Sequence, residues 1–259
     1  MPWTFAHPAA ILPLRQLCPR WLSLPALILG AMAPDLSYYV GMHGKWRGFC
    51  HTPEGILVAC LPVCLLLLAL ALRFAVPLTM LLAEPHRSLV RAQLRPSPHA
   101  VWRAVAVAAL SVLIGATTHV LWDSFTHQGL WGAELLPELE EPLLEAMDRQ
   151  FHVTNVLQHL STALGVVALA VAYRRSLHAW PPASPSPPSP LDAPRRRLLL
   201  ACLAAAIAVG ASCAYTLTPA SLPAYSSHLL VRSVVWSTSC FALLYVLGSV
   251  AWWRRLGDV

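Results

Sequence analysis

The sequence predicts an all-α protein, a bundle of about six helices that spans a membrane. Of its 259 residues, 57% are hydrophobic and only 12% are charged, about half the charged share of a soluble globular protein. The apolar residues also form long runs, and a helix needs about 20 apolar residues to cross a bilayer core of ~30 Å. Four runs reach or approach this length, and a fifth is shorter but carries no formal charge: 55–72, 104–121, 198–217, 234–253 and 157–173.

The uneven distribution of charge predicts which loops face the cytoplasm. Arginines concentrate in three segments, namely Arg73, Arg87, Arg91, Arg95 and Arg103, then Arg174, Arg175, Arg195, Arg196 and Arg197, and finally Arg254 and Arg255. The stretch 123–155 instead holds Glu134, Glu138, Glu140, Glu141, Glu145 and Asp148 against one arginine. Because cytoplasmic loops collect Lys and Arg, we expect the arginine-rich segments inside and the acidic stretch outside. This pattern explains the net charge of +6 without a nucleic-acid partner.

The first forty residues allow two paths through the membrane. Two apolar stretches precede Pro34 and Asp35, and at about 1.5 Å per residue neither crosses the bilayer alone. One path is a broken or re-entrant hairpin, whose turn must be covered by protein. The other is a single tilted span over about residues 17–40. Both paths place Asp35 near the outer side, but only the hairpin also brings His7 there.

A stretch rich in proline and serine divides the chain. Residues 181–194 have the low complexity of an extended, solvated linker. We therefore expect a membrane helical domain over residues 1–175, which carries the ionisable groups of interest. A cytoplasmic linker follows over residues 176–197, and a two-helix membrane segment over residues 198–259 completes the bundle.

Histidines and carboxylates recur at the ends of the apolar runs that the charge pattern places outside. His119 and Asp123 are four residues apart, so a helix puts them on one face. His51 precedes the first run, and Asp35 closes the segment before it. The full set expected at one outer face is Asp35, His51, His119, Asp123, His127, His152 and His159. Ionisable groups at membrane depth are costly and usually mark function.

Imidazoles combined with carboxylates favour a divalent metal, with Zn²⁺ preferred over Mn²⁺ or Fe²⁺. A single histidine at a helix end is more often an interfacial hydrogen-bonding group, so the prediction depends on the convergence of several. A second set follows on the last run of the first domain: His152, Asn155, Gln158 and His159. This set could add a second site or bind substrate oxygens. Its alternative role is ordinary hydrogen bonding at a helix end.

Three motifs carry a family resemblance: MPWTFAHPA at 1–9, MAPD at 32–35 and GATTHVLWDSFTH at 115–127. With them the chain resembles an uncharacterised bacterial membrane family of unknown function. The resemblance covers most of the chain and implies a multi-pass protein of the bacterial inner membrane.

A more remote resemblance rests on the order of His, Pro-Asp, Arg-Gly-Phe-x-His-Thr and HxxxD along the chain. This order is similar to that in the LexA-regulated membrane-bound metal-dependent hydrolases, which in turn resemble the zinc-dependent phospholipases C. The resemblance implies a metal set of His7, Asp35, His51, His119 and Asp123. The phospholipases also use a later HxxxE, which this sequence lacks. His127, His152 or His159 could substitute, so a site of one or two metals is expected.

Together, the cluster and the resemblance predict metal-dependent hydrolysis of a phosphoester, such as a lipid headgroup, at the outer membrane interface. His51, His119 and Asp123 are expected to hold the metal, with Asp35 as catalytic base or bridge to a second ion. His7 completes the site if the hairpin forms. The alternatives are a carrier, although carriers usually place their site near the bilayer midplane, and a structural protein that holds no metal tightly.

Overall fold

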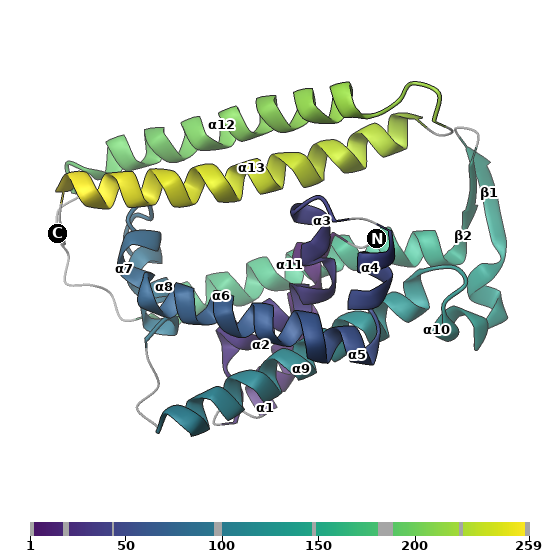
Figure 1. Ribbon diagram of the computed structural model, residues 1–259, viewed down its shortest axis with the longest axis horizontal. Coiled ribbons are helices and arrows are strands. Elements are labelled where there is room, and N and C mark those ends of the chain that lie inside the picture. The colour runs from purple at the N-terminus through teal and green to yellow at the C-terminus, as the bar shows by residue number, and fades with distance from the viewer. Residues whose placement is uncertain are drawn as a thin grey trace. The chain divides into compact units, whose positions relative to one another are not determined.

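The computed structural model describes residues 3–17, 21–42, 44–95, 100–146, 149–180, 189–222 and 225–256, almost all of them helical (Figure 1). Five helices in these ranges are long and apolar enough to cross a membrane. They are Pro53–Arg73, Val101–Thr126 (α9), Val153–Ala179 (α11), Asp192–Leu217 (α12) and His228–Leu256, the last lying within α13 (Tyr225–Leu256). Each contains most or all of one predicted apolar run, so the prediction of an all-α membrane bundle is confirmed.

The N-terminal segment turns back on itself through short helices. A 3-10 helix, η1 (Thr4–Ile11), contains Pro8 and continues into α1 (Leu12–Leu17). After residues 18–20, which lie outside the described ranges, α2 (Leu24–Met32) packs against η1. The fully buried Ile11 and Leu27 belong to the same apolar cluster. The chain therefore follows the hairpin path and not the single tilted span.

Helix α2 crosses α9 with almost no side chain between the two backbones. A β-carbon built on Gly30 would collide with the backbone of α9, and one built on Gly115 would collide with the carbonyl oxygen of Leu27. Small residues at a crossing of this kind let two membrane helices approach closely. The buried Ser111 hydroxyl also accepts a hydrogen bond of 2.9 Å from the backbone N–H of Ser23, at the start of α2. The two helices are thereby fixed in both spacing and register.

A 3-10 turn and two short helices connect α2 to the first long span. The turn, η2 (Ala33–Asp35), extends α2 directly, and α3 (Leu36–Tyr39) and α4 (Lys45–Cys50) follow. The span itself consists of α5 (Pro53–Gly55), a π-helical stretch η3 (Ile56–Cys60) and α6 (Leu61–Arg73).

The end of α4 is held against the start of this span. The Thr52 hydroxyl accepts a hydrogen bond of 3.1 Å from the backbone N–H of Gly55, and so caps α5. Gly55 approaches the carbonyl of Phe49 so closely that a β-carbon there would collide with it. His51, between α4 and α5, is therefore fixed by its neighbours on both sides.

The acidic segment between α9 and α11 folds into elements that the sequence pattern did not predict. Helices α10 (Trp131–Glu134) and η4 (Pro137–Glu140) precede two antiparallel strands, β1 (Pro142–Ala146) and β2 (Arg149–His152). The strands form the one sheet in the described part of the chain. The Gly129 N–H donates to the Glu140 carboxylate at 2.7 Å, which fixes the start of this segment.

The chain divides into two compact units, one made of residues 1–69 and 96–176 and the other of residues 70–95 and 177–259. In the second unit, α12 and α13 form an antiparallel pair (Figure 1), and Gly210 lies against the backbone of Ser237. Helices α7 (Ala75–Leu78) and α8 (His86–Gln93) also belong to it. The Tyr245 hydroxyl donates to the carbonyl of Leu78 at 2.7 Å. Residues 181–188 of the expected linker lie outside the described ranges.

Replacing Gly115 by leucine should destabilise the protein, because the new side chain has no room between α9 and α2. Overpacking of this kind costs about 1–3 kcal/mol, so the protein in detergent should unfold at a lower temperature. Ala106→Leu, at an exposed position of α9, is the matched control and should unfold like the wild type. A Gly115→Leu variant with wild-type thermal stability would contradict the close crossing.

Candidate metal centre

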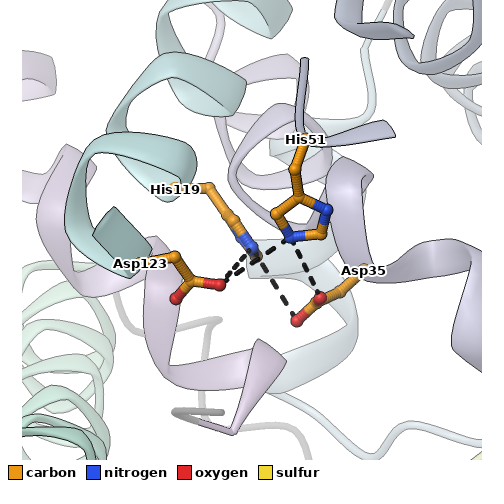
Figure 2. Close-up of side chains that lie close together, drawn as sticks. All are labelled: Asp35, His51, His119 and Asp123. Carbon is orange, nitrogen blue, oxygen red and sulfur yellow. Dashed lines mark ion pairs between the residues drawn. The ribbon is translucent and has the colours of Figure 1, made fainter. Parts of the chain in front are cut away.

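Four side chains from three separate segments meet near the C-terminal end of α9 (Figure 2). Asp35 closes η2, His51 follows α4, and His119 and Asp123 lie one turn apart on α9. Each residue offers one nitrogen or oxygen as a ligand atom, and these atoms all lie within 4.8 Å of one another. The predicted convergence of the four residues is therefore present, and the cluster has the composition to hold a metal ion.

The Nε2 atoms of both histidines face both carboxylates. Nε2 of His119 lies 3.5 Å from Oδ2 of Asp123 and 3.8 Å from Oδ2 of Asp35. Nε2 of His51 lies 3.6 Å from Oδ1 of Asp35 and 3.7 Å from Oδ2 of Asp123. These distances exceed those of ordinary hydrogen bonds. They are close to the separation of about 3.3–3.6 Å between two ligands of one tetrahedral zinc ion with bonds of ~2.0–2.2 Å.

Backbone carbonyls orient both imidazole rings. Nδ1 of His119 lies 2.8 Å from the carbonyl oxygen of Ala31, and Nδ1 of His51 lies 2.9 Å from that of Arg47. A carbonyl oxygen only accepts hydrogen bonds, so each neutral ring carries its proton on Nδ1 and presents the lone pair of Nε2 to the cluster. A histidine that ligates a metal is commonly fixed in this way by a partner of its other nitrogen.

Asp35 is fully buried and is held by the N-terminal helix. The Thr4 hydroxyl donates a hydrogen bond of 2.7 Å to Oδ2 of Asp35. Because η2 extends α2 directly, Asp35 lies four residues beyond Ala31, whose carbonyl orients His119. The same helical segment therefore supplies one ligand and positions another.

Five buried polar atoms at this place have no hydrogen-bond partner among the described residues. They are Nε2 of His7, His51 and His119, and Oδ1 of Asp35 and Asp123. Leaving a buried polar group unsatisfied costs about 1–3 kcal/mol, and such groups are rare in native proteins. Carboxylate oxygens only accept, and the rings of His51 and His119 present lone pairs. A bound cation would satisfy several of these atoms at once, so the residues fit a metal ion.

His7 joins the cluster from η1. Its Nε2 lies 3.5 Å from Oδ1 of Asp123, and its ring stacks on that of His119 with centroids 3.7 Å apart. The His7 side chain is buried, and histidine binds a metal through its neutral imidazole. The hairpin path of the N-terminal segment is what brings this residue to the site.

His127 borders the cluster but makes other contacts. Its Nδ1 lies 3.0 Å from the backbone oxygen of Asp123 and 3.7 Å from the Oδ1 of that residue. The Gln158 amide lies 3.2 Å from Nε2 of His127. Burial lowers the pKa of His127, so this ring too favours the neutral form. Its Nε2 would have to leave Gln158 to ligate an ion.

The other members of the predicted second set are not drawn into the site. The Asn155 side chain accepts a hydrogen bond of 2.9 Å from the backbone N–H of His152, an ordinary role at the start of a helix. His159 is exposed on α11. In the described part of the chain, neither His152 nor His159 makes a hydrogen bond or ion pair with the four clustered residues. Only Gln158 reaches the site, through His127.

Two residues that the sequence analysis left without a role contact the site. One is Thr4, and the other is Arg47, whose carbonyl orients His51 and whose guanidinium lies over the Tyr38 ring, 5.0 Å from its centroid. The charge of Arg47 contributes to lowering the pKa of His127, so the cation lies within electrostatic reach of the cluster. Burial raises the pKa of Tyr38 to about 12, so this phenol is neutral. The sequence motifs could have indicated both residues, because Thr4 belongs to MPWTFAHPA and Arg47 belongs to RGFCHT.

Comparison with known proteins identifies a family without an assigned activity. Residues 1–250 match the family described as "Domain of unknown function (DUF4184)". No curated protein matches the chain, and neither does any solved structure. The matched residues include the whole cluster as well as the N-terminal hairpin. The chain therefore belongs to the DUF4184 family, whose members share a domain of unknown function.

Proposed function

We propose that the protein is a membrane-bound, metal-dependent hydrolase that cleaves a phosphoester bond in a lipid headgroup. The observation that carries the proposal is the convergence of Asp35, His51, His119 and Asp123, whose ligand atoms lie within 4.8 Å of one another. Each of the four residues also has a buried polar atom without a hydrogen-bond partner among the described residues. The mixture of imidazole and carboxylate ligands suits Zn²⁺ best among the common divalent ions.

Each residue of the site has a distinct proposed role. His51, His119 and Asp123 would hold the ion, and His7 and His127 flank the second carboxylate oxygen of Asp123. A divalent ion held here would polarise a phosphoryl oxygen and lower the pKa of water. Asp35 keeps Oδ2 on the Thr4 hydroxyl and leaves Oδ1 free. That free oxygen is the proposed acceptor of the attacking water's proton.

The balance of charge favours an anionic substrate. Two carboxylates offset the charge of one divalent ion, and neutral imidazoles add none. The guanidinium of Arg47, which lies over the Tyr38 ring and acts electrostatically on His127, then adds a positive charge near the site. A guanidinium group matches the geometry of phosphate oxygens and can donate two hydrogen bonds to them. A phospholipid headgroup is the phosphoester that a membrane enzyme meets at the highest concentration.

Two features support a hydrolase over the alternatives. His119 and Asp123 lie within the last eight residues of α9, which ends at Thr126, whereas the sites of carriers usually lie near the bilayer midplane. A purely structural cluster would satisfy its buried polar groups internally, and this one leaves five polar atoms without a hydrogen-bond partner in the described part of the chain.

We also propose that the site faces the extracytoplasmic side of the bacterial inner membrane. The cluster end of α9 leads into the acidic segment, while Arg103 lies near the other end of the helix. A cysteine at Glu140, in η4, should react with a membrane-impermeant maleimide in intact cells, and one at Ser186 should not. The native protein, with its own cysteines, gives the background. Labelling of Ser186→Cys from outside would contradict the proposed orientation.

The two carboxylates should respond differently to replacement by asparagine. Asp123→Asn removes the charge of a ligand that contacts both histidines, so metal content and hydrolysis should be lost together. Asp35→Asn should keep its metal while turnover falls roughly 10²–10⁴-fold, the usual contribution of a positioned base. If Asp35 instead bridges two ions, one metal equivalent is lost as well.

Two measurements test the Asp123→Asn and Asp35→Asn variants. Mass spectrometry gives their metal content, and a panel of phospholipids with different headgroups gives their rates of hydrolysis. Glu145→Gln, which changes an exposed carboxylate on β1, is the control and should match the wild type in both. A wild-type protein that holds metal but hydrolyses no phosphoester in the panel would rule out the proposed chemistry and favour a carrier.

A further inference from the structure

An apolar hollow of about 350 Å³ lies beside the cluster, between η1, α11 and Trp122 of α9. Two residues with polar side chains, His7 and Ser161, contribute to its wall. The remaining lining residues are aliphatic or small: Ala6, Ala9, Ala10, Leu157, Leu160, Leu164, Gly165 and Ala168. The volume falls within the range of about 300–1,000 Å³ that is usual for ligand pockets.

Small residues let η1 and α11 touch and still leave a hollow beside the points of contact. The backbone N–H of Trp3 donates to the Thr162 hydroxyl at 3.0 Å and joins the start of η1 to α11. A β-carbon built on Gly165 would lie only 3.0 Å from the carbonyl oxygen of Ala6. The two helices therefore touch at these points, and the alanines of η1 leave space beside them.

The dimensions of the hollow match one leaflet of a bilayer. Its residues on α11 run from Leu157 to Ala168, which is about 16 Å along a helix axis. This is roughly half of a hydrocarbon core of ~30 Å. Helices α9 and α11 are both candidate membrane spans, and Leu160 and Leu164 are 50% and 59% exposed. In a bilayer, the molecules that contact such a surface are lipids.

The hollow and the cluster share a residue. His7 lines the hollow, and its Nε2 lies 3.5 Å from Oδ1 of Asp123. Trp122 adjoins Asp123 in the sequence and forms the wall on α9. Tryptophan is enriched at the level of lipid headgroups. The end of the hollow at His7 is therefore its polar end.

We propose that this hollow binds one acyl chain of a membrane lipid, so that the headgroup of that lipid is presented to the His/Asp cluster. The proposal rests on the proposed hydrolase and narrows its substrate to a lipid that still carries an acyl chain. The cluster recognises the phosphoryl group, while the hollow selects for a hydrocarbon chain in the same leaflet. A water-soluble phosphoester would lack the second contact.

The test is photocrosslinking of the metal-loaded protein in nanodiscs of phosphatidylethanolamine and phosphatidylglycerol. The probe is phosphatidylglycerol with a diazirine at the end of one acyl chain, and mass spectrometry locates the modified residues. Crosslinks should concentrate on Leu164, Ala168 and Ala10. Ala168→Trp fills the hollow and should reduce them several-fold. Ala170→Trp, at an exposed position on the opposite face of α11, should not.

The possible outcomes separate the two proposals. Crosslinks spread evenly over the exposed face of α11 and insensitive to Ala168→Trp would overturn the acyl-chain site, because they report bulk lipid. Crosslinks on other exposed surfaces of the membrane helices but none on the lining of the hollow would also overturn it, in favour of a hollow that another part of the chain or a second copy covers. If Ala168→Trp does not fold, the map of the native protein decides. Localised crosslinks without headgroup hydrolysis would keep the lipid site and reject the hydrolase.

Discussion

The close crossing of α2 and α9 is the constraint on which the site depends. Gly30 and Gly115 allow the two backbones to touch, and this contact brings the carbonyl of Ala31 within 2.8 Å of Nδ1 of His119. That hydrogen bond fixes the ring so that Nε2 faces the carboxylates. Since η2 extends α2 without a break, the same contact also places Asp35. A shift of either helix would misplace two members of the cluster together.

Burying this many polar groups costs free energy that the described residues do not recover among themselves. Thr4 offsets part of the cost at Asp35, and stacking on His119 covers the ring of His7. Five polar atoms still remain without a hydrogen-bond partner among these residues, each with a desolvation cost of about 1–3 kcal/mol. A bound divalent ion accounts for the arrangement because one charge would satisfy several acceptors at once. It would also tie the N-terminal hairpin to α9, so that metal binding and folding are coupled.

Much of this arrangement is encoded locally and could be predicted. Unbroken apolar runs identified the five long helices, and the spacing of His119 and Asp123 placed them on one helical face. The asymmetry of charge grouped Asp35 and His51 with them, because it predicts which end of each apolar run lies on the outer side of the membrane. The sequence left two paths open for the N-terminal segment, and packing of Ile11 and Leu27 decides between them.

Other features depend on contacts between distant segments and left no local signal. The Thr4 hydroxyl donates a hydrogen bond to Asp35, and the Gln158 amide contacts Nε2 of His127. Both contacts form only once η1, η2, α9 and α11 are packed together. The spacings of three and four residues between His152, Asn155 and His159 suggested a second site, yet Asn155 serves the start of α11 and His159 is exposed. The strands β1 and β2 are too short for their alternation to stand out in an acidic loop.

The most direct test of this account is the metal content of protein purified without chelators, measured by mass spectrometry for the wild type, His119→Ala and His159→Ala. The wild type should carry divalent metal, predominantly zinc, in stoichiometric amount. His119→Ala should fall to background, because it removes a fully buried ligand, while His159→Ala should keep the wild-type content. A wild-type protein that holds no divalent metal even after incubation with Zn²⁺, or a His119→Ala variant that keeps all of it, would contradict the central claim.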